Sequence, residues 1–137
     1  MIEKELLSLD KKVRDYLPDI GTGYAEASLQ SLLDMTVNNN FTEDYSDPHS
    51  DCYTEEIALG WRLPSNNMVK ESTLVEFTNG ITGYSEQEKV TVAQYKSANT
   101  DVLTRILEKM SPKSLTEHIE EIADAIGYEG SFHISLS

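Results

Sequence analysis

Apolar residues recur at helical spacing along the first forty positions of the chain. Ile2, Leu6, Leu9 and Val13 share one face of a predicted amphipathic helix over residues 2–17. Pro18 ends this helix, because the residue before a proline avoids the helical region. A second helix is predicted over about 24–37. Gly21 and Gly23 lie between the two helices and are interpreted as a linker, since no buried strand precedes them as a nucleotide-binding loop requires.

Helical spacing returns near the C-terminus. A helix is predicted to begin at Asn99 or Thr100 and to run to Met110. A last helix follows, where Ser114 and Glu117 form a capping-box pattern and Gly127 marks the end. Its apolar stripe is expected to be buried and consists of Leu115, Ile119, Ile122, Ala123 and Ile126.

Between these helical regions the pattern changes to short apolar runs and alternation, which predicts β-strands. Asn79-Gly80 is a strong hairpin signal, and Trp61 lies in an apolar run that is expected to enter the core. The predicted strands cover residues 57–63, 73–78, 81–84, 89–95 and 131–136.

These elements predict a single α+β domain over residues 1–137. An antiparallel sheet of about four to five strands packs against an N-terminal and a C-terminal pair of helices. The expected segments are a helical pair over 1–40, an acidic loop over 41–56, the sheet over 57–96, a helical pair over 99–127 and a C-terminal strand over 131–136.

The distribution of charge along the chain indicates more about function than the overall composition does. The formal net charge is −13, and residues 15–61 carry ten acidic side chains without one lysine or arginine. Such a field repels nucleic acid and anionic membranes and attracts basic proteins. The single cysteine, Cys52, favours a reducing cytoplasm. No signal peptide and no apolar stretch of about 20 residues is recognised, so a cytoplasmic protein without a membrane segment is expected.

The acidic segment 42–56, TEDYSDPHSDCYTEE, concentrates the candidate chemistry. As a calcium loop from Asp44 to Glu55 it fails, because Pro48 offers no side-chain ligand and His49 replaces the required glycine. Asp47, His49 and Asp51 alternate and leave a weak metal site open as an alternative. The preferred interpretation has no metal and no cofactor.

Nothing in the sequence indicates a catalytic residue. Nucleophilic catalysis needs a base beside the nucleophile and a third group that orients the base. The three histidines, His49, His118 and His133, lie in no recognisable nucleophile motif.

The preferred interpretation is instead a recognition surface made of carboxylates and tyrosines. Tyr45 and Tyr53 lie inside the acidic segment, and the last helix carries a second acidic stripe. The predicted partner-binding residues are Glu43, Asp44, Tyr45, Asp47, Asp51, Tyr53, Glu55, Glu56, Glu117, Glu120, Glu121 and Asp124.

The function predicted from these features is a non-enzymatic acidic inhibitor that imitates nucleic acid. Its expected partner is a basic nuclease or nucleic-acid-binding complex, without direct binding to nucleic acid or membranes. A phage counter-defence protein of the anti-restriction or anti-CRISPR type and an immunity protein for a toxic nuclease fit equally. An acidic chaperone or assembly component is the alternative, and a small metal-dependent enzyme is a third. A homo-oligomer is compatible with each.

Overall fold

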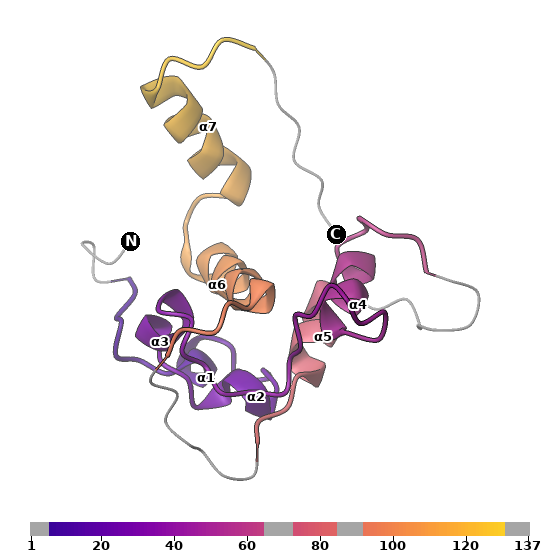
Figure 1. Cartoon of the computed structure of the whole chain (residues 1–137). Helices are drawn as coiled ribbons and strands as arrows, with labels where there is room; N and C mark the ends of the chain where they lie inside the picture. The colour runs from indigo at the N-terminus through magenta and orange to yellow at the C-terminus, as the bar shows by residue number, and fades with distance from the viewer. Residues whose placement is uncertain (1–5, 65–72, 85–91, 131–137) are drawn as a thin grey trace.

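The computed structural model describes residues 6–64, 73–84 and 92–130, and all secondary structure in these ranges is helical (Figure 1). The only extended pairing there is an isolated bridge between Lys12 and Ser28. The helices are α1 (Val13–Tyr16), α2 (Thr22–Ala25), α3 (Leu29–Leu33), α4 (Asp51–Ala58), α5 (Leu74–Gly80), α6 (Ser97–Met110) and α7 (Leu115–Ala125). Within the described residues, no helix has the length and apolar character needed to cross a bilayer.

Helix α6 is the centre of the fold. Ala98, Val102 and Ile106 are fully buried and recur every four residues, so they form an apolar stripe along one face of the helix. Helices α1, α3, α4 and α5 pack against α6 (Figure 1). The prediction of this helix from its apolar spacing is confirmed, with the start two residues earlier than Asn99.

The N-terminal helices are shorter than predicted. Only Val13–Tyr16 of the expected helix 2–17 is helical in the described residues, and 24–37 holds the end of α2 and the whole of the short helix α3. Backbone hydrogen bonds between the segments replace helical ones. Val13 N donates to Ala27 O at 2.8 Å, and Leu29 N donates to Lys11 O at 3.1 Å. Gly21 is the N-cap of α2, as expected of a linker that starts a helix, whereas Gly23 lies inside α2 and is not part of a linker.

The predicted sheet is wrong. Residues 73–80 form α5, where the side chains of Thr73 and Glu76 make a reciprocal capping box, and Asn79-Gly80 ends that helix instead of forming a hairpin. Strand 57–63 is contradicted because α4 runs to Ala58, and Trp61 is 77% exposed. Residues 81–84 and 92–95 are not strands, whereas 89–91 and the strand 131–136 lie outside the described residues.

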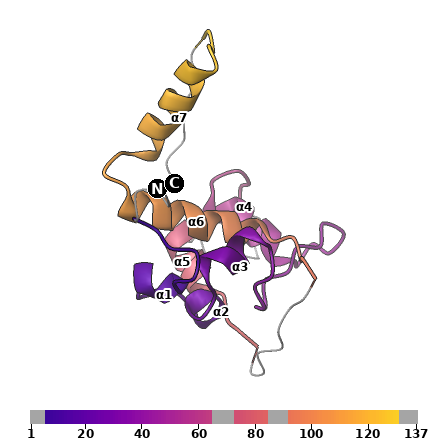
Figure 2. The same ribbon diagram turned by 90° about the vertical axis from the view of Figure 1, so that its left-hand side faces the viewer.

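Helix α7 has its predicted capping box but not its predicted burial. Ser114 Oγ accepts from Glu117 N at 3.2 Å, and Gly127 has a φ of +70°, which glycine adopts without strain. None of the α7 residues is buried, and Ile122 and Ile126 are 61% and 74% exposed. The helix extends away from the other helices beyond the end of α6 (Figure 2).

Candidate functional site

The N-terminus of α6 gathers polar groups from distant parts of the chain. Lys96 at the N-cap makes no side-chain capping bond to the helix. Glu43 takes over this role, because its Oε2 accepts from Ser97 N at 2.7 Å. A carboxylate is favourable here, since the first N–H groups of a helix lack partners and its N-terminus is partly positive.

A buried polar network lies behind this helix end. Lys96 Nζ donates to Asn39 O at 2.9 Å and to Asn39 Oδ1 at 2.7 Å. Tyr24 donates its hydroxyl hydrogen to Asn99 Oδ1 at 3.0 Å. Burial lowers the pKa of Lys96 and raises the pKa of Tyr24, because the charged form of each side chain is poorly solvated. These bonds fix the segments before α4 and α6 relative to each other.

A pair of carboxyl groups lies beside Ser97. Glu55 on α4 is 3% exposed and accepts a hydrogen bond from the Ser97 hydroxyl. Burial and a hydrogen bond with Asp101 on α6 raise the pKa of Glu55 to about 8. Burial raises the pKa of Asp101 as well.

The solvent side of this region carries tyrosines. Tyr45 donates its hydroxyl hydrogen to Glu43 Oε1 at 2.8 Å, and this bond raises the pKa of Tyr45 to about 12. Tyr53 donates to Tyr45 O at 2.7 Å, and the two rings meet edge to face with centroids 6.4 Å apart. We call Glu43, Tyr45, Tyr53 and Ser97 the tyrosine–carboxylate face. Tyr45 is 61% exposed, so its ring is accessible to a ligand.

Most other carboxylates of the predicted acidic loop stabilise its backbone. Asp44 Oδ1 accepts from the Ser46 hydroxyl at 2.6 Å and from Ser46 N at 2.8 Å, and these two bonds lower the pKa of Asp44. Asp47 Oδ1 accepts from His49 N at 2.9 Å. Asp51 Oδ2 accepts from Thr42 N at 2.9 Å, at the start of α4. The second half of the segment is therefore a helix, and its first half is a series of turns held by side chains.

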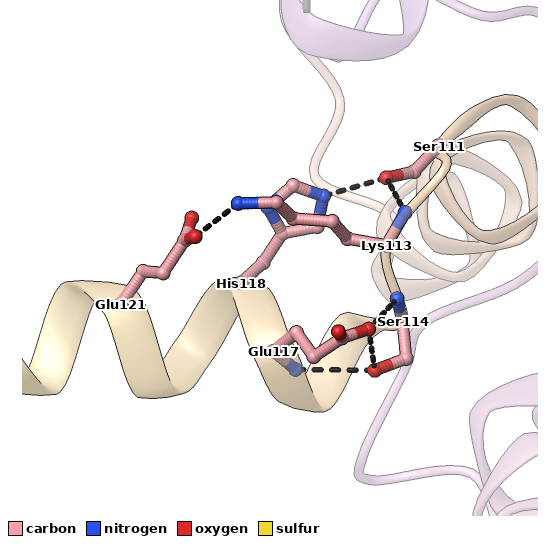
Figure 3. Close-up of polar contacts among 6 residues, drawn as sticks. All are labelled: Ser111, Lys113, Ser114, Glu117, His118 and Glu121. Atoms are coloured by element: carbon pink, nitrogen blue, oxygen red, sulfur yellow. Dashed lines mark hydrogen bonds and ion pairs between the residues drawn. The ribbon is translucent and has the colours of Figure 1, made fainter.

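The remaining predicted partner-binding residues are not brought together. Glu56 pairs with Arg62 at 2.6 Å, whereas Glu55 is turned into the core. Glu117, Glu120, Glu121 and Asp124 lie on α7, away from the acidic segment. Glu121 forms an ion pair with Lys113, and Glu117 is used by the capping box, as Figure 3 shows. The acidic stripe of α7 is therefore partly neutralised by a lysine just before the helix.

Ser111 and His118 form a pair at the corner between α6 and α7 (Figure 3). Ser111 Oγ and His118 Nε2 lie 2.7 Å apart, and Ser111 Oγ also accepts from Lys113 N at 3.1 Å. The six residues drawn include no carboxylate that is hydrogen-bonded to the imidazole, as a catalytic triad would need to orient it. We interpret it as a contact that fixes the corner.

The metal alternative has no support in the described residues. Within them, no group of three histidine, cysteine or carboxylate side chains is arranged to hold a metal ion. Asp47 and Asp51 instead accept hydrogen bonds from backbone N–H groups.

Sequence reasoning missed the buried half of the site, namely Asn39, Lys96, Ser97, Asn99 and Asp101. One signal was present in the sequence. Asn99 lies three residues before Val102 and seven before Ile106, so it occupies the apolar face of α6. A polar residue on such a face requires a buried partner, which is Tyr24.

The sequence and the fold were compared with those of known proteins. No protein-family model matches the sequence. The chain is 30% identical over 112 residues to the 6-aminohexanoate-dimer hydrolase of Paenarthrobacter ureafaciens, an alignment that covers 81% of the chain and 27% of that enzyme. Among solved structures, it resembles a Bacillus anthracis protein provisionally named as a 6-aminohexanoate-dimer hydrolase. The TM-score is 0.71 at 22% identity, over 88% of the chain and 31% of that protein.

These similarities overturn the predicted function. The relatives are named as hydrolases, which contradicts a non-enzymatic inhibitor in its phage and immunity versions, and the acidic chaperone with it. No observation on the described residues tests the expected basic partner, which stays a prediction. The chain spans about a quarter to a third of the length of these relatives. It shares the fold of the matching part of the Bacillus anthracis protein.

Proposed function

We propose that this chain functions in the hydrolysis of a linear amide, and that its tyrosine–carboxylate face is one wall of the substrate site. The sequence similarity to 6-aminohexanoate-dimer hydrolase carries this proposal, because it extends over 81% of the chain. The name of that relative indicates the substrate class: two 6-aminohexanoate units joined by one amide bond. A cytoplasmic location, which the single cysteine favours, is part of the proposal.

The chemistry of the face suits such a substrate. The polymethylene segments of the dimer are apolar, and the exposed ring of Tyr45 offers apolar surface with a polar end, beside the half-buried ring of Tyr53. Its free amino end is a cation at neutral pH. Glu43 uses one lone pair on each oxygen, for Tyr45 and for Ser97 N, and a carboxylate has further acceptor positions for an ammonium group.

The buried network supports the wall from behind. A binding site works best when its side chains are fixed before the ligand arrives. Glu43 is held by the helix end, and Tyr45 is held both by Glu43 and by the backbone contact with Tyr53. The face is therefore a preorganised surface.

Saturation-transfer NMR with the linear 6-aminohexanoate dimer tests the proposal. We expect transfer to the methylene protons of the dimer with the natural chain and a loss of most of this signal with Tyr45→Ala. Tyr128→Ala is the matched control, because Tyr128 is also half-exposed but lies beyond α7. Equal signals from Tyr45→Ala and the natural chain, or no transfer at millimolar dimer, contradict the proposal.

A further inference from the structure

Helices α4 and α6 bring together two carboxyl groups, of which Glu55 is buried and Asp101 is half-buried. Glu55 on α4 is 3% exposed, and its Oε2 accepts from the Ser97 hydroxyl of α6. Asp101 lies four residues after Ser97, so both side chains lie on the same face of α6. The face of α6 that meets Glu55 therefore presents a hydroxyl and, one turn later, a second carboxyl.

Each carboxyl has one oxygen that no ordinary donor reaches. Glu55 Oε1 and Asp101 Oδ2 are both buried, and neither accepts a hydrogen bond from an N–H or hydroxyl group of the described residues. None of the described ion pairs includes Glu55 or Asp101. Two adjacent carboxylates that are shielded from water and lack a cation repel each other. If one of them binds a proton, it becomes a hydrogen-bond donor and the other remains its acceptor.

We propose that Glu55 and Asp101 share one proton, and that this carboxyl pair is a positioning device that fixes Ser97 and the first turn of α6 under the tyrosine–carboxylate face. The Ser97 hydroxyl donates to Glu55, and Ser97 N donates to Glu43. Asp101 lies one turn after Ser97 on the same face of α6, next to Glu55. The consequence for ligand binding rests on the function proposed above, whereas the shared proton does not.

The surroundings of the pair favour the singly protonated form. Glu43 approaches from the segment before α4, and Tyr24 approaches from α2. Lys96, just before α6, directs its ammonium group to Asn39 and not to the pair. The pKa of Glu55 is raised to about 8 by burial and by Asp101, so the pair keeps its proton at neutral pH.

The sign of the pH effect follows from this. A carboxyl whose pKa is higher in the folded chain than in the unfolded chain makes the folded chain bind more protons. The contribution of this pair to stability is therefore largest below the unfolded pKa of Glu55. It falls as the pH rises from 4.5 towards 8 and is constant above that range.

Two measurements test the pair. Infrared spectroscopy at pH 7 is expected to show one neutral carboxyl that disappears in Glu55→Gln and in Asp101→Asn. Thermal unfolding from pH 5 to 9 is expected to show a decline in Tm for the natural chain that is reduced in Glu55→Gln, whose amide resembles a protonated carboxyl. Glu56→Gln is the control: it alters the neighbouring residue of α4, which pairs with Arg62, and should keep the natural pH dependence.

Dimer binding provides the functional readout. The natural chain should bind the dimer at least threefold more weakly at pH 9 than at pH 7, and this pH dependence should be lost in Glu55→Gln. The same pH profile of Tm in Glu55→Gln and the natural chain, or no neutral carboxyl at pH 7, overturns the carboxyl pair. If the spectra and the pH dependence of Tm are as expected but neither the natural chain nor a variant binds the dimer, the proposed function is wrong and the shared proton is still supported.

Discussion

The hydroxyl of Tyr24 donates a 3.0 Å hydrogen bond to Asn99 Oδ1, joining α2 to α6 across 75 positions of sequence. Both side chains are completely buried, and Asn99 Nδ2 donates to Leu32 O at 3.3 Å. This bond ties the N-terminal helices to the helix whose first turn carries the candidate site.

Asn99→Ala should lower the free energy of unfolding by about 1–3 kcal/mol, because it removes the acceptor of the buried Tyr24 hydroxyl and the amide that donates to Leu32 O. Chemical denaturation measures this loss. In a double-mutant cycle with Tyr24→Phe, the two changes should be non-additive by at least about 0.5 kcal/mol. Strict additivity would show that the two side chains do not interact.

Gly21 should not tolerate alanine. A Cβ atom there would lie 2.3 Å from Asn79 O and 2.5 Å from Ile81 O, and both are backbone atoms that a rotamer change cannot move. We expect Gly21→Ala to destabilise the fold by roughly 1–3 kcal/mol through overpacking. Gly80→Ala is the matched control, since nothing lies within 4 Å of its added Cβ, and it should be neutral or slightly stabilising. Equal denaturation midpoints for the two variants would refute the close packing of α2 against the end of α5.

The apolar face of α7 should contribute little to the stability of this chain. Ile126→Ser removes a side chain that is 74% exposed, so the expected change is within about 0.5 kcal/mol. Ile106→Ala, in the buried face of α6, should cost about 2–5 kcal/mol. A large loss of stability in Ile126→Ser, measured by the same denaturation curves, would mean that α7 packs against the other helices.

Glu43 should control the ionisation of Tyr45. The phenol donates to Glu43 Oε1, and its loss of a proton would place two negative charges 2.8 Å apart, which raises the pKa of Tyr45 to about 12. Glu43→Gln should shift the pKa of Tyr45 down towards 10. The pH dependence of the ring-carbon chemical shift of Tyr45 reports this midpoint by NMR. The same titration midpoint of Tyr45 in both proteins would show that Glu43 does not control the pKa of Tyr45.

The long helices could be predicted from the sequence because their apolar spacing and caps agree. The same capping signal precedes α5, where Thr73 and Glu76 correspond to Ser114 and Glu117 of α7. It was outweighed by the alternation of Val75 and Phe77 and by Asn79-Gly80, which locally favour a hairpin. Packing against α4 and α6 stabilises the helical form of this segment. The strand propensity of a segment depends on neighbouring strands that its own sequence does not contain.

The exposed half of the candidate site could be predicted in part, and the buried half could not. Tyrosines among carboxylates singled out Tyr45 and Tyr53 as a recognition surface, and they lie on the face proposed for the substrate. The contact between Glu55 and Ser97 spans 42 positions, and the bond from Ser97 N to Glu43 spans 54. Such pairs follow from how α4 packs on α6, and net charge carries no information about that packing.

Amide chemical shifts of the folded chain, recorded during titration with the linear 6-aminohexanoate dimer, test the central claim most directly. We expect the largest changes on Ser97, Glu43 and Tyr45, and we expect them to saturate at lower concentrations of dimer than of 6-aminohexanoate itself, which lacks the amide bond. Changes centred on the exposed face of α7, or none at millimolar dimer, would contradict it.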